Sequence, residues 1–265
     1  IRSIIFDIYG TLLVSGSGDI GTTKFSLKSD TFLNSMLKAG ITVLDKQAGQ
    51  RGLKYYYDEI EKSHKSSKDK GIINPEVIIT DIWHNTLARL VQNKLIKTKI
   101  TKYTKQYAAV YFECASNPVW PMPNIIRVLN QLSARKIVLG IISNAQFYTP
   151  LLFEALTNFS LTELGFNSKL IEYSYRNNEA KPSTTMFRSV LKAQKTHFNI
   201  MPANTLYIGN DMLNDIYSAK MSGFKTALFA GDTRSLRLRK DDKRVLGIAP
   251  DIVITDLIQV LDFID

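Results

Sequence analysis

Short apolar runs alternate with helical stretches along the chain, and this alternation constrains the fold more than any other sequence feature. Runs of this length suit strands that are buried on both faces. The predicted strands are residues 3–6, 137–142, 169–173, 205–208, 225–229 and 251–254. The predicted helices of this region are residues 124–135, 148–156, 184–193 and 213–221. Alternating strands and helices form right-handed βαβ units, so we expect an α/β protein with a parallel sheet.

A long helical region separates the first strand from the rest of this pattern. From about Thr22 to Ser116 apolar residues recur at three- and four-residue steps, and residues 117–123, with three prolines, indicate the return linker. Residues 14–21, rich in Ser and Gly, are expected to be a flexible connector. We expect no strand between the opening stretch and about residue 135. The predicted domains are a core of residues 1–16 and 117–265 and an all-helical insertion of residues 17–116.

The composition places the chain among ordinary globular proteins. It has 265 residues, 45% of them hydrophobic and 22% charged, and no apolar run approaches the roughly 20 residues of a membrane span. The single cysteine, Cys114, excludes an internal disulfide framework and is expected to be a packed structural thiol. The chain starts at Ile1 without a signal-peptide pattern, so a cytoplasmic location and no membrane partner are expected.

The net charge of +10 is concentrated in two regions. Residues 62–105 hold nine lysines and Arg89 against three acidic residues, and a second cluster comprises Arg234, Arg237, Arg239, Lys240, Lys243 and Arg244. Such patches attract polyanions, but no nucleic-acid recognition motif accompanies them. Solvated helix faces are the preferred interpretation, followed by a field that attracts a small anionic substrate. No nucleic-acid partner is predicted, and the oligomeric state is left open.

Polar residues follow three of the predicted strands and precede one of the predicted helices. Asp7 follows the first strand, Ser143 and Asn144 follow the second, Lys181 precedes a helix, and residues 209–215 (GNDMLND) follow the fourth strand. Because the carboxyl ends of parallel strands meet at one edge of the sheet, these groups can converge. Taken singly, each has an ordinary explanation, such as a helix cap or a surface lysine. Their joint order and spacing favour a catalytic site.

Three carboxylates at one edge, those of Asp7, Asp211 and Asp215, repel one another unless a cation lies among them. Oxygen ligands favour Mg²⁺ over Zn²⁺, and Lys181 supplies one further positive charge. A phosphate ester would suit such a site, with Ser143, Thr11 and backbone amides as hydrogen-bond donors. Asp7 could attack phosphorus and form an aspartyl-phosphate.

These motifs resemble those of the haloacid dehalogenase-like (HAD) superfamily of hydrolases. Asp7-Ile8-Tyr9-Gly10-Thr11 resembles its first motif, Ser143 its second, Lys181 its third, and residues 209–215 its fourth. The resemblance implies a Rossmann-like core with a helical cap after the first strand. It also implies Asp7 as nucleophile, Ser143 and Lys181 as catalytic partners, and Thr11 and Asn144 as substrate-binding residues. The implied Mg²⁺ ligands are Asp7, the backbone carbonyl of Tyr9, Asp211 and Asp215.

Tyr9 departs from the phosphatase pattern of this superfamily, which has a second Asp at that position as general acid and base. Asp-x-Tyr-Gly-Thr resembles the first motif of the metal-independent 2-haloacid dehalogenases instead. Those enzymes generally lack an acidic pair such as Asp211 and Asp215. They also carry an Arg early in the cap, whereas here no Arg lies between Arg2 and Arg51. A phosphonate-cleaving enzyme and a module that binds a phospho-ligand or a protein without turnover are further alternatives. The acidic pair favours an Mg²⁺-dependent phosphatase of a small phosphorylated metabolite.

Overall fold

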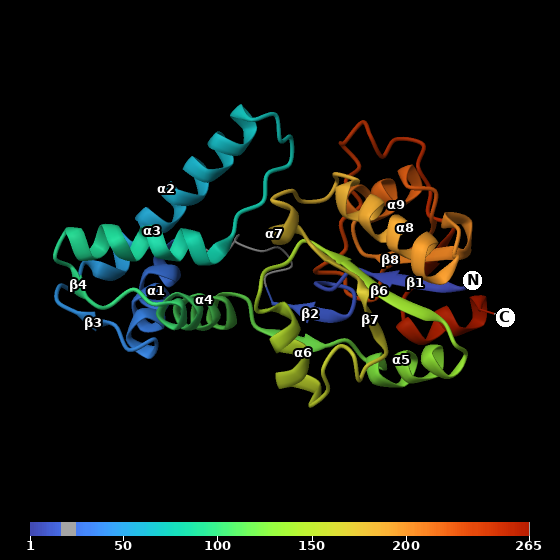
Figure 1. Ribbon diagram of the computed structural model, residues 1–265, viewed down its shortest axis with the longest axis horizontal. Coiled ribbons are helices and arrows are strands. Elements are labelled where there is room, and N and C mark those ends of the chain that lie inside the picture. Colours follow the sequence, from blue (N-terminus) through green and yellow to red (C-terminus); the bar gives the residue numbers. More distant parts are fainter. Residues whose placement is uncertain (17–24, 265) are drawn as a thin grey trace. The chain divides into compact units, whose positions relative to one another are not determined.

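The computed structural model describes residues 1–16 and 25–264 of the chain (Figure 1). The chain divides into two compact units, one formed by Ile1–Gly18 and Val119–Asp265 and the other by Asp19–Pro118. We call them the core unit and the helical unit and describe each by itself. Along the described residues no helix combines the length and the apolar character that crossing a membrane requires.

A six-stranded parallel sheet forms the centre of the core unit, so the predicted α/β class is confirmed. Its strands lie in the order β10-β9-β8-β1-β6-β7, which places β1 between β8 and β6. Phe6, the last residue of β1, is in register with Ile141 of β6 and Ile208 of β8. The strands are β1 (Ser3–Phe6), β6 (Val138–Ser143), β7 (Phe166–Tyr173), β8 (Thr205–Gly209), β9 (Lys225–Phe229) and β10 (Ile252–Ile254).

Helices cover both faces of this sheet. One face packs against α5 and the C-terminal 3₁₀ helix, and the other against α8 and α9 (Figure 1). Strand side chains on either face of the sheet therefore meet apolar neighbours. This explains why the strand sequences are continuous apolar runs. The helices of this unit are α5 (Ile125–Ala134), α6 (Thr149–Thr157), α7 (Ser174–Asn177), α8 (Thr185–Phe198) and α9 (Ser218–Met221), with 3₁₀ helices at Pro202–Asn204 and Leu257–Phe263 and a π-helix at Met212–Tyr217.

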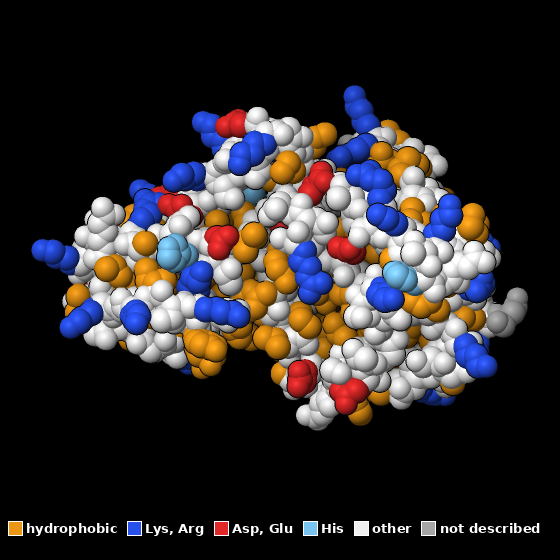
Figure 2. Space-filling model, viewed as in Figure 1, with side chains coloured by type: hydrophobic (Ala, Val, Ile, Leu, Met, Phe, Trp, Pro, Cys, Tyr) orange, Lys and Arg blue, Asp and Glu red, His pale blue; other side chains and the backbone are white. Residues whose placement is uncertain are grey.

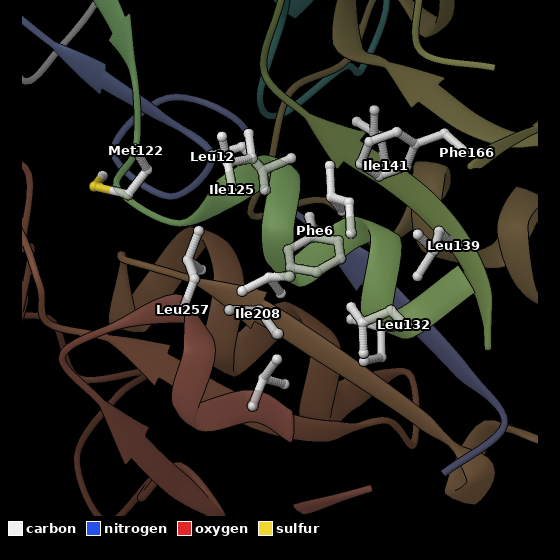
Figure 3. Packing of buried hydrophobic residues seen from close by; sticks show 14 of the residues in the cluster. Phe6, Leu12, Met122, Ile125, Leu132, Leu139, Ile141, Phe166, Ile208 and Leu257 are labelled. Carbon is white, nitrogen blue, oxygen red and sulfur yellow. The ribbon is translucent and has the colours of Figure 1, made fainter. Parts of the chain in front are cut away.

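The main hydrophobic core lies between the sheet and α5. Figure 3 shows Phe6 of β1 close to Leu132 of α5 and Ile208 of β8, and all three side chains are buried. The Phe6 ring also meets Phe166 of β7 edge to face, with ring centroids 6.1 Å apart. Burying side chains of this size stabilises the fold by roughly 1.5–3 kcal/mol each, so the core fixes β1 and the residues that follow it.

The prediction of no strand between the opening stretch and about residue 135 is wrong. Strand β2 (Leu13–Ser15) pairs antiparallel with β5 (Val119–Pro121), and β3 (Thr42–Val43) pairs with β4 (Ile96–Lys97). Strands of two or three residues are too short for an alternating pattern to be recognised in the sequence. Residues 14 and 15 of the expected connector thus belong to strand β2. Residues 17–21 of the connector lie outside the described residues.

From residue 25 onward, four helices and one aromatic cluster make up most of the helical unit. Phe32 stacks on Trp83 with ring centroids 4.6 Å apart, and Tyr56 and Phe112 meet both rings. Tyr56 is therefore a core residue of this unit. The helices are α1 (Phe25–Lys38), α2 (Ala48–Asp69), α3 (Ile79–Gln92) and α4 (Lys102–Ser116). Cys114 near the end of α4 is exposed, so the prediction of a packed thiol is wrong.

Positive charge is distributed over both units. In Figure 2, Lys and Arg side chains are scattered across the visible face of the described residues, and acidic side chains lie between them. Several cations are held in ion pairs, such as Arg89 with Asp58 and Glu59 on the helical unit. This distribution agrees with the interpretation of most of the excess charge as solvated helix faces.

Candidate active site

Asp7 lies directly after β1 and is buried at the carboxyl edge of the sheet. Its backbone N–H donates to the carbonyl of Ile208 on β8, which fixes it relative to that strand. The chain then turns at Gly10, whose φ of +85° favours glycine, and a Cβ there would lie 2.5 Å from the Asn210 side chain. The motif therefore needs glycine both for the turn and for the close approach to the fourth motif.

Lys181 joins two of the predicted carboxylates. Its Nζ donates to Asp7 Oδ1 at 2.7 Å and to Asp215 Oδ1 at 2.6 Å, and only 3% of its side chain is exposed. Burial alone would lower the pKa of Lys181, but the adjacent carboxylates of Asp215 and Asp7 outweigh it and raise the pKa well above its ordinary value. Lys181 is thus a permanent buried cation that holds Asp7 in place.

Asn144 holds the backbone of Lys181. The Asn144 Oδ1 accepts the Lys181 backbone N–H at 2.8 Å, and its Nδ2 donates to the Lys181 carbonyl at 3.4 Å. This geometry assigns the Asn144 amide to positioning the lysine. Its predicted contact with substrate stays a prediction.

Asp215 is the most enclosed carboxylate of the site. Its Oδ2 accepts the backbone N–H of Asp211, and its Oδ1 lies 3.0 Å from the hydroxyl of Tyr207 on β8. Burial raises the pKa of Asp215 to about 7, opposed by Lys181 and reinforced by the charges of Asp7 and Asp211. A Cβ at Gly209 would lie 2.3 Å from the Asp215 carboxyl carbon, so the glycine makes room for it.

Tyr207 is a site residue that the sequence analysis missed. Its hydroxyl accepts from Lys181 Nζ at 3.1 Å and lies 2.9 Å from the Ile142 carbonyl oxygen. Burial raises the pKa of Tyr207 well above its ordinary value, and the neighbouring carboxylate of Asp215 adds to this effect. Because its position falls within a buried apolar strand, the sequence indicates a core residue, and the one available signal is a phenol among aliphatic neighbours.

Asp211 faces a second cation, Arg239. The Arg239 guanidinium donates to Asp211 Oδ2 through NH2 at 2.6 Å and through Nε at 3.0 Å. Asp211 Oδ1 accepts the backbone N–H groups of Leu213 and Asn214, so this carboxylate also caps the π-helix. The basic cluster around Arg239 is visible in the sequence, but its pairing with Asp211 is not.

Ser143 ends β6, next to β1, and its side chain is buried. Its Oγ is buried and unpaired among the described residues, an arrangement that costs free energy unless a ligand or water supplies an acceptor. The hydroxyl of Thr11 donates to Asn210 Oδ1 at 3.3 Å, and the Tyr9 hydroxyl lies 3.0 Å from Thr149 Oγ1. Ser143 is therefore the predicted donor that most clearly lacks an acceptor.

The predicted three-carboxylate magnesium site is not preformed. Within residues 1–16 and 25–264, no group of three or more His, Cys, Asp or Glu side chains is arranged to hold a metal ion. Asp211 is turned to Arg239, and both oxygens of Asp215 accept hydrogen bonds from within the site.

The chemistry of the donors nevertheless fits a hard cation. With all three carboxylates ionised, Lys181 and Arg239 leave one negative charge uncompensated, and Asp211 already binds a cationic group. Carboxylate and carbonyl oxygens are the ligands that Mg²⁺ prefers. Asp7 and Asp211 could therefore hold such a cation, and the roles of the Tyr9 carbonyl and Asp215 as metal ligands stay predictions.

Comparison with known proteins places these residues in a wider context. The model of the family described as haloacid dehalogenase-like hydrolase matches residues 4–229. No curated protein sequence matches the chain. A 2-haloacid dehalogenase from Pseudomonas syringae has a similar structure, with 16% identity, a TM-score of 0.60, and coverage of 99% of this chain and 97% of that one.

Two further solved structures resemble the chain over nearly its whole length. A predicted phosphoglycolate phosphatase from Haemophilus somnus has 16% identity and a TM-score of 0.54, covering 100% of this chain and 98% of that one. YfnB from Bacillus subtilis, described as a HAD-hydrolase and bound to magnesium, has 15% identity and a TM-score of 0.52, with coverage of 100% and 98%. At such identities the likeness is one of fold.

Proposed function

Because this chain belongs to the haloacid dehalogenase-like hydrolases, we propose that it is an Mg²⁺-dependent phosphatase acting on a small phosphorylated metabolite. The observation that carries the proposal is the charge balance of the site, in which three buried carboxylates face two cationic side chains. The additional acidic pair, Asp211 and Asp215, is explained by a reaction that uses a metal cation.

The proposed reaction has two steps. One carboxylate oxygen of Asp7 attacks phosphorus, a new P–O bond forms, and the bond to the leaving oxygen breaks with its electron pair. Water then attacks phosphorus of the aspartyl-phosphate, and the bond between phosphorus and the Asp7 oxygen breaks with its electron pair, which regenerates the Asp7 carboxylate. The released phosphate carries the oxygen of the water, and the proton that the water loses passes to solvent. Lys181 holds Asp7 Oδ1, and the unpaired Ser143 hydroxyl would donate to an oxygen of the transferred group. A bound Mg²⁺ would offset negative charge on the phosphoryl oxygens.

Tyr9 restricts the substrate class. A phenol of ordinary pKa near 10 cannot protonate a leaving alkoxide efficiently at neutral pH, and the loss of such help costs roughly 10²–10⁴-fold in rate. The Tyr9 hydroxyl also lies 3.0 Å from Thr149 Oγ1. We therefore favour a leaving group that needs no proton, as in an acyl phosphate.

A screen of acyl phosphates and alkyl phosphates with and without Mg²⁺ tests the proposal. We expect Mg²⁺-dependent phosphate release that is fastest with acyl phosphates and is abolished in Asp7→Asn. An Asp262→Asn variant, which alters an exposed carboxylate of the C-terminal 3₁₀ helix, serves as the control and should keep full activity. No turnover of any phosphorylated compound, or turnover unchanged by Asp7→Asn, contradicts the proposal.

A metal-independent 2-haloacid dehalogenase is the second candidate, and Tyr9 is the observation that favours it. A halide leaves without a proton, so a tyrosine at this position would cost nothing in that reaction. Chloride release from 2-chloropropionate in the presence of EDTA would support this candidate over the phosphatase. Absence of chloride release would remove it.

A further inference from the structure

The segment from Asp232 to Arg244 carries the second basic cluster past the active site. Its first half is anchored to the fourth motif, because Arg237 N–H donates to the Asn210 carbonyl and Met212 N–H donates to the Arg237 carbonyl. The side chain of Asn210 donates to the carbonyl of Ser235 as well. Arg239 follows directly after this anchor. The segment is therefore built to hold one guanidinium against the site.

Arg239 differs from the other cations of its segment in what it contacts. Arg234 pairs with Asp232 and Arg244 pairs with Asp242, both within the segment itself. Arg239 reaches Asp211, with contacts to both carboxylate oxygens between 2.6 and 3.3 Å. Its backbone φ of +50° lies in the left-handed region that non-glycine residues rarely adopt. Arg239 thus contacts Asp211 from an uncommon backbone conformation.

The pair of Arg239 and Asp211 and a metal at Asp211 exclude each other. Mg²⁺ requires near-ideal octahedral geometry with oxygens at about 2.0–2.1 Å, which a carboxylate bonded to a fork of guanidinium donors cannot supply. A metal can bind only after the ion pair opens, so the free energy of the pair is subtracted from the free energy of metal binding. With 35% of its side chain exposed, Arg239 can move into solvent without burying an unpaired charge.

We propose that Arg239 is a built-in counter-ion of Asp211 that competes with the divalent cation and thereby sets the cation affinity of the site. This inference rests on the proposed function only in taking Asp211 as a metal ligand. Arg239 acts through Asp211 and is a positioning residue. It keeps Asp211 neutralised when no metal is bound and raises the free Mg²⁺ concentration at which the site fills.

Calorimetric titration of Mg²⁺ into the full chain without substrate tests the inference. We expect Arg239→Gln to bind Mg²⁺ about three- to fivefold more tightly than the unaltered chain, because a partly exposed ion pair no longer opposes the metal. Arg239→Lys, which keeps the charge but loses the fork, should give an intermediate affinity. Arg244→Gln removes a cation of the same segment that pairs only with Asp242 among the ion pairs described, and it should leave the affinity unchanged.

Each outcome of the Mg²⁺ titration either supports or overturns the inference. Unchanged or weaker binding in both Arg239 variants, or absence of binding in all proteins, overturns the inference. Equal tightening by Arg239→Gln and Arg244→Gln would show a general charge effect and overturns it too. Turnover is not needed for the measurement. Tighter Mg²⁺ binding in Arg239→Gln without hydrolysis of any phosphorylated compound would uphold the counter-ion and refute the phosphatase, whereas Mg²⁺-dependent hydrolysis with unaltered affinity would do the reverse.

Discussion

The two sides of the active site neutralise their carboxylates in opposite ways. Lys181 is 3% exposed and bridges Asp7 and Asp215, whereas Arg239 is 35% exposed and comes from a surface segment. A buried charge that loses its partner is costly, but a half-exposed guanidinium can exchange its partner for water. The difference indicates one permanent cation that maintains the site and one exchangeable cation that leaves room for a ligand.

The largest expected effect comes from removing the permanent cation. Lys181→Met leaves Asp7 and Asp215 buried without their partner, so we expect the free energy of unfolding to fall by about 3–5 kcal/mol and activity to be lost. Urea unfolding measures the change. Lys220→Met, which removes a partly exposed partner of Asp251, is the matched control and should cost at most about 1 kcal/mol. Equal losses in the two variants would contradict the contrast.

The next effect concerns Tyr9, two residues after Asp7. Tyr9→Asp introduces a carboxyl group that can protonate a leaving group, so hydrolysis of alkyl phosphates should rise about 10- to 100-fold, while that of acyl phosphates changes little. Tyr9→Phe, which removes the hydroxyl and adds no acid, is the control and should show no gain. The ratio of kcat values for the two substrate types is the measurement. A gain in Tyr9→Phe as well would point to altered packing near Thr149.

Alkaline pH should weaken the stabilisation that Lys181 and its neighbour Tyr207 contribute. The folded pKa values of Lys181 and Tyr207 lie above their ordinary values of 10.5 and 10.0, so the folded chain keeps protons that the unfolded chain releases. Their contribution to stability is therefore complete below about pH 10 and is lost as the pH rises through the folded pKa values. Unfolding midpoints between pH 8 and 11 should fall less steeply in Tyr207→Phe than in the unaltered chain. An identical slope would contradict this assignment.

The smallest expected effect is on the exchangeable side. Arg239→Gln should change the free energy of unfolding by no more than about 1 kcal/mol in EDTA, because the pair is partly exposed and screened by solvent. The left-handed backbone at Arg239 would persist in the variant. Thermal unfolding without metal measures this. A loss comparable to that of Lys181→Met would mean that both cations are structural, and the distinction between the two sides would disappear.

The sheet and most of the site follow from local sequence patterns. Apolar runs locate the strands, and the edge at which parallel strands end brings Asp7, Ser143 and Lys181 close together although they are distant in sequence. These features depend on residues within a few positions of each strand end, which is why the sequence predicts them.

What the sequence does not predict depends on contacts between distant segments. Arg239 contacts Asp211 from a segment that is bonded to Asn210, and neither this tertiary pairing nor the left-handed backbone at Arg239 has a local signature. Tyr207 is hidden among the apolar residues of β8, and its role depends on which way its hydroxyl points. The exact use of Asn144 as a clamp on Lys181 likewise depends on a tertiary hydrogen bond.

The pairing of β2 with β5 has a consequence for how this chain can be altered. The chain leaves the core unit after one of these strands and returns to it at the other, and paired strands lie about 4.8 Å apart. A short turn could therefore join them, because the six-stranded sheet contains no strand of the helical unit. Exchanging the helical unit for such a turn would leave the register of the parallel sheet untouched.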